Sequence, residues 1–123
     1  MVKLKGFTLI ELLVVLAIIA MLLTLAMPRY FSSLERAKVD ALRHDLATMR
    51  EAIDKYYGDT GQYPDSLNQL VDKKYLRAIP PDPLTDSPET WVVEPPKEGL
   101  GAVFDVRSGA RGQTNDGKEY GEL

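Results

Sequence analysis

The carboxylate of Glu11 lies inside an apolar run near the start of the chain. Residues 7–27 are apolar except for Thr8, Glu11 and Thr24. A carboxylate at the centre of a membrane-spanning helix costs about 2.5–3.5 kcal/mol on insertion scales, and less near a helix end. Two interpretations follow. Either Glu11 reaches the headgroup region and does nothing further, or it pairs with a positive charge of another subunit, where low dielectric strengthens the attraction.

The run around Glu11 has the length of a membrane span. At about 1.5 Å rise per residue, a helix over residues 7–27 is about 31 Å long, and the hydrocarbon core of a bilayer is about 30 Å thick. Lys3 and Lys5 precede the run, so the positive-inside rule predicts a single pass with a cytoplasmic N-terminus and with everything after Met27 translocated. A removed signal peptide fits poorly, because its apolar region is about 7–15 residues long and ends in small residues.

Composition argues against several classes of function. The 123-residue chain has no cysteine, so disulfides and thiolate metal sites are not expected. Its one histidine, His44, lies among charged residues, and no nucleophile elbow or phosphate-binding glycine loop is present, so we do not expect an enzyme. Asp82 and Asp86 lie in a proline-rich loop and are interpreted as turn residues. The net charge of −3 disfavours contacts to nucleic-acid phosphates.

The residues after the apolar run predict that the helix continues. Pro28 lacks an amide hydrogen, so a kink or stop is expected near residues 24–27. Beyond it, apolar side chains recur at steps of three and four, as on one face of an amphipathic helix. This stripe consists of Leu34, Ala37, Ala41, Leu42, Leu46, Met49, Ile53, Tyr56 and Tyr57. We expect one helix over residues 7–57, membrane-spanning over 7–27 and amphipathic over 28–57, which Gly58 ends.

Residues 58–123 predict a small α+β region packed on this stripe. The pair Asp65-Ser66 is expected to cap a short helix that begins near Leu67. Residues 90–94 and 102–106 are rich in β-forming side chains and are joined by a loop with proline and glycine, so we expect two antiparallel strands. The strand side chains expected to pack on the helix are Trp91, Val93, Val103 and Phe104.

The motif that precedes the apolar run reads KGFTLIE, from Lys5 to Glu11. With its basic leader and the run that follows, it resembles the processing signal of type IV pilins and of the pseudopilins of type II secretion. The resemblance implies that residues 1–6 are a cytoplasmic leader peptide, which prepilin peptidase removes by cutting between Gly6 and Phe7 before it methylates the Phe7 amine. Gly6 lets the backbone approach a protease closely.

The same resemblance implies two assembly residues. Glu11 neutralises the Phe7 amine of a neighbouring subunit, which answers why a carboxylate is tolerated in the apolar run. Pro28 contributes to a flexible stretch that lets the helix adjust as subunits pack. Within one subunit, the i, i+4 spacing of Phe7 and Glu11 on a helix also permits a pair.

The globular half extends the resemblance to nearly the whole chain. A Tyr-Pro pair precedes the short helix, and LRAIPPDP (76–83), Trp91, two strands and FDVRSG (104–109) follow. This order is most similar to the major pseudopilins of type II secretion. It implies a pilin-like α+β fold, in which a long N-terminal helix packs on a small antiparallel sheet with a C-terminal loop, and an inner-membrane protein whose residues 58–123 are periplasmic.

The resemblance also implies a function and partners. The chain would be a structural subunit of a short periplasmic filament, the pseudopilus, that drives protein export. Its partners would be further copies in a helical filament, prepilin peptidase, minor pseudopilins, an inner-membrane platform protein and an assembly ATPase, with no nucleic acid. The alternative is a major or minor type IV pilus subunit in adhesion, motility or DNA uptake. The absence of cysteine weighs against the pilins that carry a C-terminal disulfide loop.

Major pseudopilins usually bind calcium in their last loop, and the resemblance implies a calcium site in this chain. Calcium takes about six to eight oxygen ligands. The candidate ligands are Asp105, Ser108, Asn115 and Asp116. Arg111 argues against the metal, because a guanidinium cannot coordinate a cation. Two alternatives stay open: a calcium-bound loop, or a metal-free loop that Arg111 closes by pairing with Asp116 or Glu119.

Overall fold

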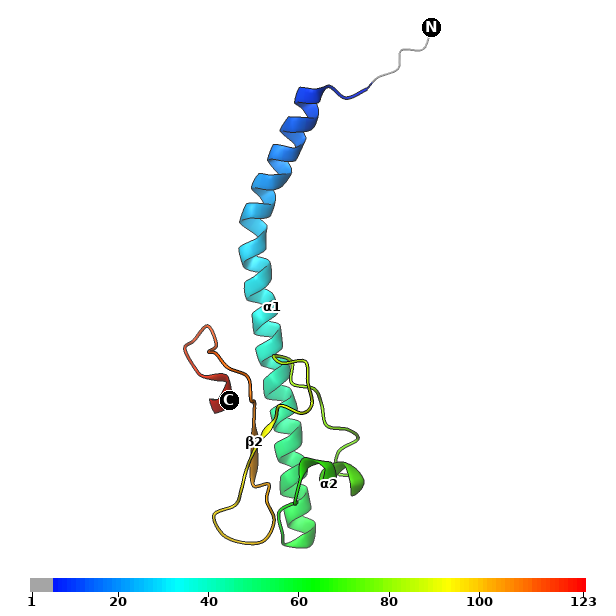
Figure 1. Ribbon diagram of the computed structural model, residues 1–123, viewed down its shortest axis with the longest axis vertical. Coiled ribbons are helices and arrows are strands. Elements are labelled where there is room, and N and C mark those ends of the chain that lie inside the picture. Colours follow the sequence, from blue (N-terminus) through cyan, green and yellow to red (C-terminus); the bar gives the residue numbers. More distant parts are fainter. Residues whose placement is uncertain (1–5) are drawn as a thin grey trace. The chain divides into compact units, whose positions relative to one another are not determined.

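A computed structural model describes residues 6–123. In chain order, its elements are helix α1 (Leu9–Thr60), helix α2 (Leu67–Asp72), strands β1 (Val92–Glu94) and β2 (Asp105–Arg107), and the 3-10 helix η1 (Tyr120–Glu122) (Figure 1). The strands form an antiparallel pair, and the predicted α+β class is confirmed. Internal contacts divide the chain into two compact units, of which one ends at Arg36 and the other comprises Ala37–Leu123. Lys3 and Lys5, which underlie the predicted topology, lie outside the described residues.

Helix α1 begins after a polar cap. The first helical residue is Leu9, and the hydroxyl oxygen of Thr8 accepts a hydrogen bond from the Glu11 amide at 3.1 Å. A threonine in this position satisfies one of the amides that a helix start leaves without a partner. The expected start at Phe7 is therefore wrong, because the threonine cap, and not the first apolar residue, sets the boundary.

Helix α1 ends at a glycine in the left-handed region. Gly61 has φ +74°, and its amide donates to the Tyr57 carbonyl at 2.8 Å. This is a common termination, in which a residue without a side chain turns the backbone out of the helix. The expected stop at Gly58 is wrong, because Gly58 is still helical and the chain turns only after Thr60.

Pro28 lies inside α1, and the helix is continuous from Leu9 to Thr60. Of the two expected alternatives near residues 24–27, a kink or a stop, the stop is therefore excluded. Proline removes one backbone hydrogen bond, but the turns on either side remain bonded, and adding to a formed helix is far easier than starting a new one. The Thr24 hydroxyl donates to the Ala20 carbonyl at 2.8 Å in the preceding turn.

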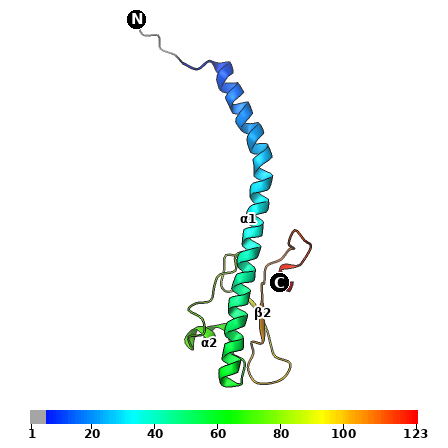
Figure 2. The same ribbon diagram turned by 180° about the vertical axis from the view of Figure 1, so that it is seen from behind.

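The core of the unit Ala37–Leu123 forms along one face of α1. Figures 1 and 2 show α2 and β2 on opposite sides of the C-terminal part of this helix. The most deeply buried side chains are Leu42, Leu46, Met49 and Ile53 of α1, Leu70 of α2, Val106 of β2, and Val103. Burying a side chain of this size contributes about 1.5–3 kcal/mol. The predicted stripe is confirmed from Leu42 to Tyr56, whereas its end residues are exposed and the helix also buries two residues outside it. The exposed members are Leu34, Ala37, Ala41 and Tyr57, and the additional buried residues are Val39 and Ala52.

Two of the four strand residues expected in the core are outside it. Trp91 and Val103 are buried as predicted, whereas Val93 is 41% exposed and Phe104 is 49% exposed. All three residues of β1 are exposed, and Val106 of β2 is buried in place of the missing pair. The second strand starts later than expected, because the amides of residues 102 and 103 donate to the Pro64 carbonyl at 3.0 and 2.9 Å and not to β1.

Candidate functional site

The helix start places Glu11 as the first charged side chain of an apolar segment. The amide of Glu11 donates a hydrogen bond to the Thr8 hydroxyl oxygen at 3.1 Å, so the cap fixes the backbone of Glu11. Within residues 6–123 its carboxylate forms no ion pair. A negative charge in the first turn is favoured by the partial positive charge of a helix N-terminus. The carboxylate is thus oriented by its own helix and remains available to a cation from elsewhere.

Thr8 is a site residue that the sequence reasoning missed. Thr8-Leu9-Ile10-Glu11 has the Thr-x-x-Glu spacing of a capping box, in which the first residue caps the helix and the fourth is Glu or Gln. That spacing was readable in the sequence. Because Phe7 precedes the cap, Phe7 and Glu11 are not related by helical i, i+4 spacing in this chain. The suggested pair within one subunit, which needs the free amine of a cleaved chain, stays a prediction.

The residues at the expected cleavage point are accessible. Gly6 and Phe7 lie before the helix, and the Phe7 side chain is 85% exposed. A Cβ placed on Gly6 would meet nothing within 4 Å. The chain itself therefore leaves room at residue 6, and any need for glycine there comes from an outside partner.

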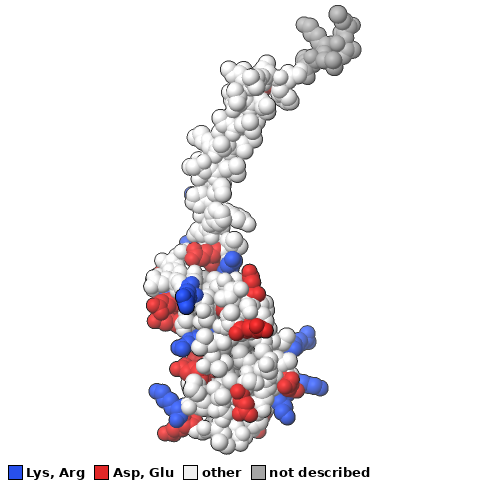
Figure 3. Space-filling view, viewed as in Figure 1, with Lys and Arg blue, Asp and Glu red and all other residues white. Residues whose placement is uncertain are grey.

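The apolar part of α1 is exposed throughout. Its most apolar 18-residue window has a mean hydropathy of 2.9, with 0% of its residues buried. By length and composition, the helix is able to cross a membrane. Figure 3 shows this surface as almost wholly uncharged, whereas Lys, Arg, Asp and Glu gather on the C-terminal unit. Tyr30 and Phe31 follow the apolar segment as an edge-to-face pair, which suits a membrane interface.

The candidate calcium ligands are engaged in other contacts or point to solvent. Asp105 Oδ1 accepts from Arg50 at 2.8 Å, and the Ser108 hydroxyl donates to Asp82 at 2.5 Å. Asn115 and Asp116 are exposed. Among the described residues, no three His, Asp or Glu side chains gather as a metal-binding group. This donor set does not fit a calcium cage of six to eight oxygens.

Arg111 does not close the last loop. Neither ion pair in the described part of the chain contains Arg111: they join Arg50 to Asp105 and Lys55 to Glu51. The suggested pair of Arg111 with Asp116 or Glu119 is therefore wrong. The cation that contacts β2 and the C-terminal residue is Arg50 of α1.

Among the described residues, Asp45 and Tyr75 have shifted pKa values. Burial raises the pKa of the Asp45 carboxyl; nearby His44 lowers it, and the negative charge of Asp82 raises it further. The pKa of Tyr75 is raised chiefly because its hydroxyl donates to Asp59 at 2.6 Å. Neither group belongs to a cluster that resembles a catalytic site.

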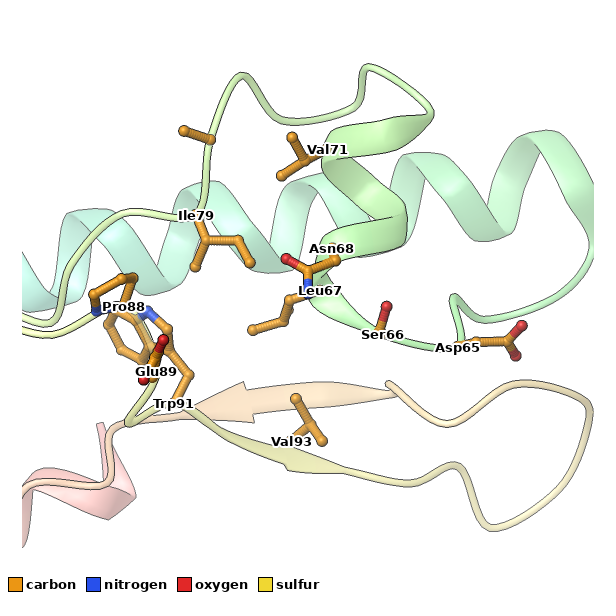
Figure 4. A pocket seen from close by; sticks show the side chains of 11 residues that line it. Asp65, Ser66, Leu67, Asn68, Val71, Ile79, Pro88, Glu89, Trp91 and Val93 are labelled. Atoms are coloured by element: carbon orange, nitrogen blue, oxygen red, sulfur yellow. The ribbon is translucent and has the colours of Figure 1, made fainter.

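A groove of about 550 Å³ lies between α2 and the segment Pro88–Val93. Figure 4 shows Leu67, Ile79 and Trp91 around it, with Asp65 and Glu89 among its few charged residues. The lining contains no histidine or cysteine.

The interpretation of Asp82 as a turn residue is confirmed, because its Oδ1 accepts the Leu84 amide at 2.9 Å.

The N-terminal site and the α+β unit define a class of protein, which comparison with known proteins supports. Residues 1–27 match the prokaryotic N-terminal methylation motif, which identifies a pilin-like protein. Residues 29–122 match the family described as type II secretion system protein G. Since this match covers most of the chain, the chain belongs to the type II secretion system protein G family, which is a family of structural pseudopilins and not of enzymes.

Curated relatives agree with this family. A type II secretion system core protein G from Dickeya chrysanthemi is 28% identical over 95% of this chain and 76% of its own length. Another, from Pseudomonas aeruginosa, is 34% identical over 64% of this chain and 67% of its own length. Fimbrial protein EcpC from Eikenella corrodens is 38% identical over 61% of this chain and 52% of its own length. No solved structure matches the chain.

Proposed function

We propose that this pseudopilin polymerises into a short periplasmic filament that drives protein export by type II secretion. Prepilin peptidase cuts between Gly6 and Phe7 and methylates the Phe7 amine, so that each mature subunit starts with a cation. Glu11 of one subunit then receives the Phe7 amine of the next. The family membership supports this role, and the exposed junction at Gly6 supports the processing step.

The single observation that carries the proposal is the exposure of the apolar segment of α1 together with its one unpaired carboxylate. Its most apolar window is 0% buried within the chain, and its one acidic residue, Glu11, has no cationic partner among residues 6–123. Exposed apolar patches of this size mark membrane or protein contacts. A filament of parallel helices covers the apolar surface and gives the carboxylate a cation in a medium of low dielectric, where the attraction is strong.

The location and partners follow from this role. The basic leader stays in the cytoplasm, α1 crosses the inner membrane once, and the unit Ala37–Leu123 lies in the periplasm. Minor pseudopilins, an inner-membrane platform protein and an assembly ATPase act on the filament. The chain supplies surface and charge to this assembly and performs no chemistry of its own.

A type IV pilus subunit is the second candidate, favoured by the similarity to a fimbrial protein from Eikenella corrodens. It is less supported, because the protein G family matches residues 29–122, which include all of the C-terminal unit except Leu123. Deletion of the gene separates the two: loss of secreted proteins with unchanged surface pili supports the pseudopilin, and loss of surface pili supports the pilin.

Replacement of Glu11 tests the proposal. We expect Glu11→Ala to be inserted and processed normally but to reduce sheared filaments at least about tenfold, which corresponds to the loss of about 1.4 kcal/mol per subunit contact. Thr24→Ala is the matched control, because Thr24 is a polar residue in the same apolar segment with only a bond to its own helix. Filaments are counted by electron microscopy after shearing, and processing is read from the gel shift. Normal filaments from a processed Glu11→Ala protein would refute the proposed charge pair.

A further inference from the structure

The side chain of Arg50 joins three points of the C-terminal segment. Its Nε donates to Asp105 Oδ1 at 2.8 Å, its Nη2 to the Val106 carbonyl at 2.9 Å and its Nη1 to the Leu123 main-chain oxygen at 3.1 Å. Arg50 lies on α1, Asp105 and Val106 lie on β2, and Leu123 follows η1. One guanidinium therefore ties the long helix to the beginning and the end of residues 105–123, with the forked geometry that lysine cannot reproduce.

A buried carboxylate holds the same segment at Ser108, directly after β2. Asp82 is 0% exposed, and its Oδ2 accepts from the Ser108 hydroxyl at 2.5 Å. The Ser108 oxygen in turn accepts the Ala110 amide at 3.1 Å, and the other Asp82 oxygen accepts the Leu84 amide at 2.9 Å. A buried carboxylate is tolerated when its oxygens are hydrogen-bonded, and here those bonds fasten residue 108.

The loop beyond Ser108 is closed by its own backbone. The Thr114 amide donates to the Lys118 carbonyl at 2.7 Å, and the Gly117 amide donates to the Thr114 carbonyl at 2.9 Å. Gly117 has φ +85°, which lets the chain reverse there. Asn115 and Asp116 occupy the tip of this turn with exposed side chains. Both residues have a turn-forming role that requires no metal.

We propose that the Arg50 guanidinium takes the place of a divalent cation in this chain, while Asp82 holds Ser108, so that residues 105–123 are ordered without calcium. Calcium in a pilin-like loop would draw carboxylate and carbonyl oxygens together. Here the Arg50 guanidinium does so for Asp105, Val106 and Leu123, and those oxygens are therefore already occupied by hydrogen-bond donors. The inference goes beyond the proposed filament function, since it concerns the stability of one subunit.

Hydrogen exchange of the full chain in detergent micelles tests this inference. Amides of residues 105–123 are measured by mass spectrometry in excess EGTA and in excess calcium chloride. We expect protection to be equal in both solutions and the thermal midpoint to be unchanged. A slowing of exchange by about tenfold or more with calcium, or a rise of the midpoint by about 5 °C, would overturn the inference.

Replacement of Arg50 tests the other half. Arg50→Ala is expected to speed exchange of residues 105–123 at least about tenfold in EGTA, because three charge-assisted bonds are lost. Arg50→Lys is expected to restore less than half of the effect on a logarithmic scale. Arg43→Ala is the control, because Arg43 is exposed on the same helix. Unchanged exchange in Arg50→Ala would overturn the inference, and the calcium comparison on the unaltered chain decides it even if a variant fails to fold.

Discussion

At the scale of single residues, the backbone and the side chain of Glu11 have different roles. The amide completes the helix cap with Thr8, while the carboxylate stays unpaired within residues 6–123. A side chain that also closed the cap would be less available to another subunit. The cap therefore orients Glu11 and leaves its charge available for the proposed pair with another subunit.

The role of Thr8 leads to a prediction about the helix start. Thr8→Val removes the oxygen that accepts the Glu11 amide, at a cost of about 1 kcal/mol to the first turn. We expect exchange of the Glu11 amide to become about five times faster, as measured by NMR of the full chain in micelles. Thr8→Ser keeps the acceptor and should leave the rate near that of the unaltered chain. Equal rates in all three proteins would contradict the cap.

The open surroundings of Gly6 lead to a prediction about processing. A side chain at residue 6 meets nothing within the chain, so Gly6→Leu should fold and insert normally. We expect it to accumulate as the uncut precursor, with less than about a tenth of normal cleavage, because the bulky side chain blocks close approach to the peptidase. Gly6→Ala should fall between the two. Full cleavage of Gly6→Leu, seen as a normal shift on a gel, would argue that the glycine is not required.

At the scale of elements, the loop between β1 and β2 depends on one close approach. Gly101 has φ +103°, and a Cβ there would lie 2.1 Å from the Tyr63 carbonyl oxygen. Nearby, the Tyr63 amide donates to the Leu100 carbonyl at 3.1 Å, and the Tyr63 ring lies against Phe104. Gly101 thus brings the strand connection against the segment that follows α1.

This geometry predicts different costs for two glycines in one loop. Gly101→Ala combines an unfavourable φ with a backbone clash and is expected to destabilise the chain by about 3 kcal/mol or more. Gly99→Ala is the matched control, since Gly99 has φ +99° but open space around it, and should cost only about 1 kcal/mol. Thermal unfolding followed by circular dichroism measures both. Equal destabilisation would show that the clash with Tyr63 is relieved by a small shift.

The elements themselves were largely predictable from the sequence, and their ends were not. The period of apolar residues predicted α1 and the middle of its buried face, from Leu42 to Tyr56. Ser66 was expected to help cap α2, where its hydroxyl accepts the Gln69 amide at 3.2 Å. The second strand was misplaced because its neighbouring residues bond to Pro64, which is distant in sequence. Local sequence patterns indicate the propensity of a segment to form a strand. The residues at which a strand begins and ends depend on hydrogen bonds to residues that are distant in sequence.

At the scale of the whole molecule, the two units are stabilised differently. The unit Ala37–Leu123 has its own core around Leu46 and Val106. The apolar window of α1 has 0% of its residues buried, so its helix must be stabilised by backbone bonds and by a membrane or other subunits. Unfolding experiments on the subunit therefore report chiefly on residues 37–123.

The raised pKa of Asp45 gives a pH-dependent prediction for that unit. Because burial raises the folded pKa above the unfolded value, the charged form costs stability at neutral pH, and this cost disappears as the pH falls through the folded pKa. Asp45→Asn is expected to raise stability at pH 7 by about 0.5 kcal/mol, a small gain because the group is partly exposed. The gain should shrink near pH 4. Thermal unfolding of both proteins at the two pH values measures it, and a gain that grows on acidification would contradict the assigned cause.

The residues of the N-terminal motif are easier to group from the sequence than the contacts that hold residues 105–123. Glu11 and Gly6 stand in a contiguous motif, so the sequence alone brought them together. Arg50 meets Asp105 and Leu123 only after the chain folds, and nothing in its local pattern distinguishes it from Arg43 on the same helix. Periodicity reports only neighbours along the helix, so it predicts neither the contacts of Arg50 nor the absence of an Arg111 pair within the described residues.

The position of Trp91 has a practical consequence. It is the chain's single tryptophan, only 8% exposed, and its indole nitrogen donates to the Pro80 carbonyl at 2.8 Å. The intrinsic tryptophan fluorescence of the chain therefore comes from one largely buried side chain in the unit Ala37–Leu123. Unfolding of that unit should shift the emission maximum to longer wavelength, with no attached dye needed. Packing of the apolar segments of α1 from different subunits should leave the emission maximum unchanged.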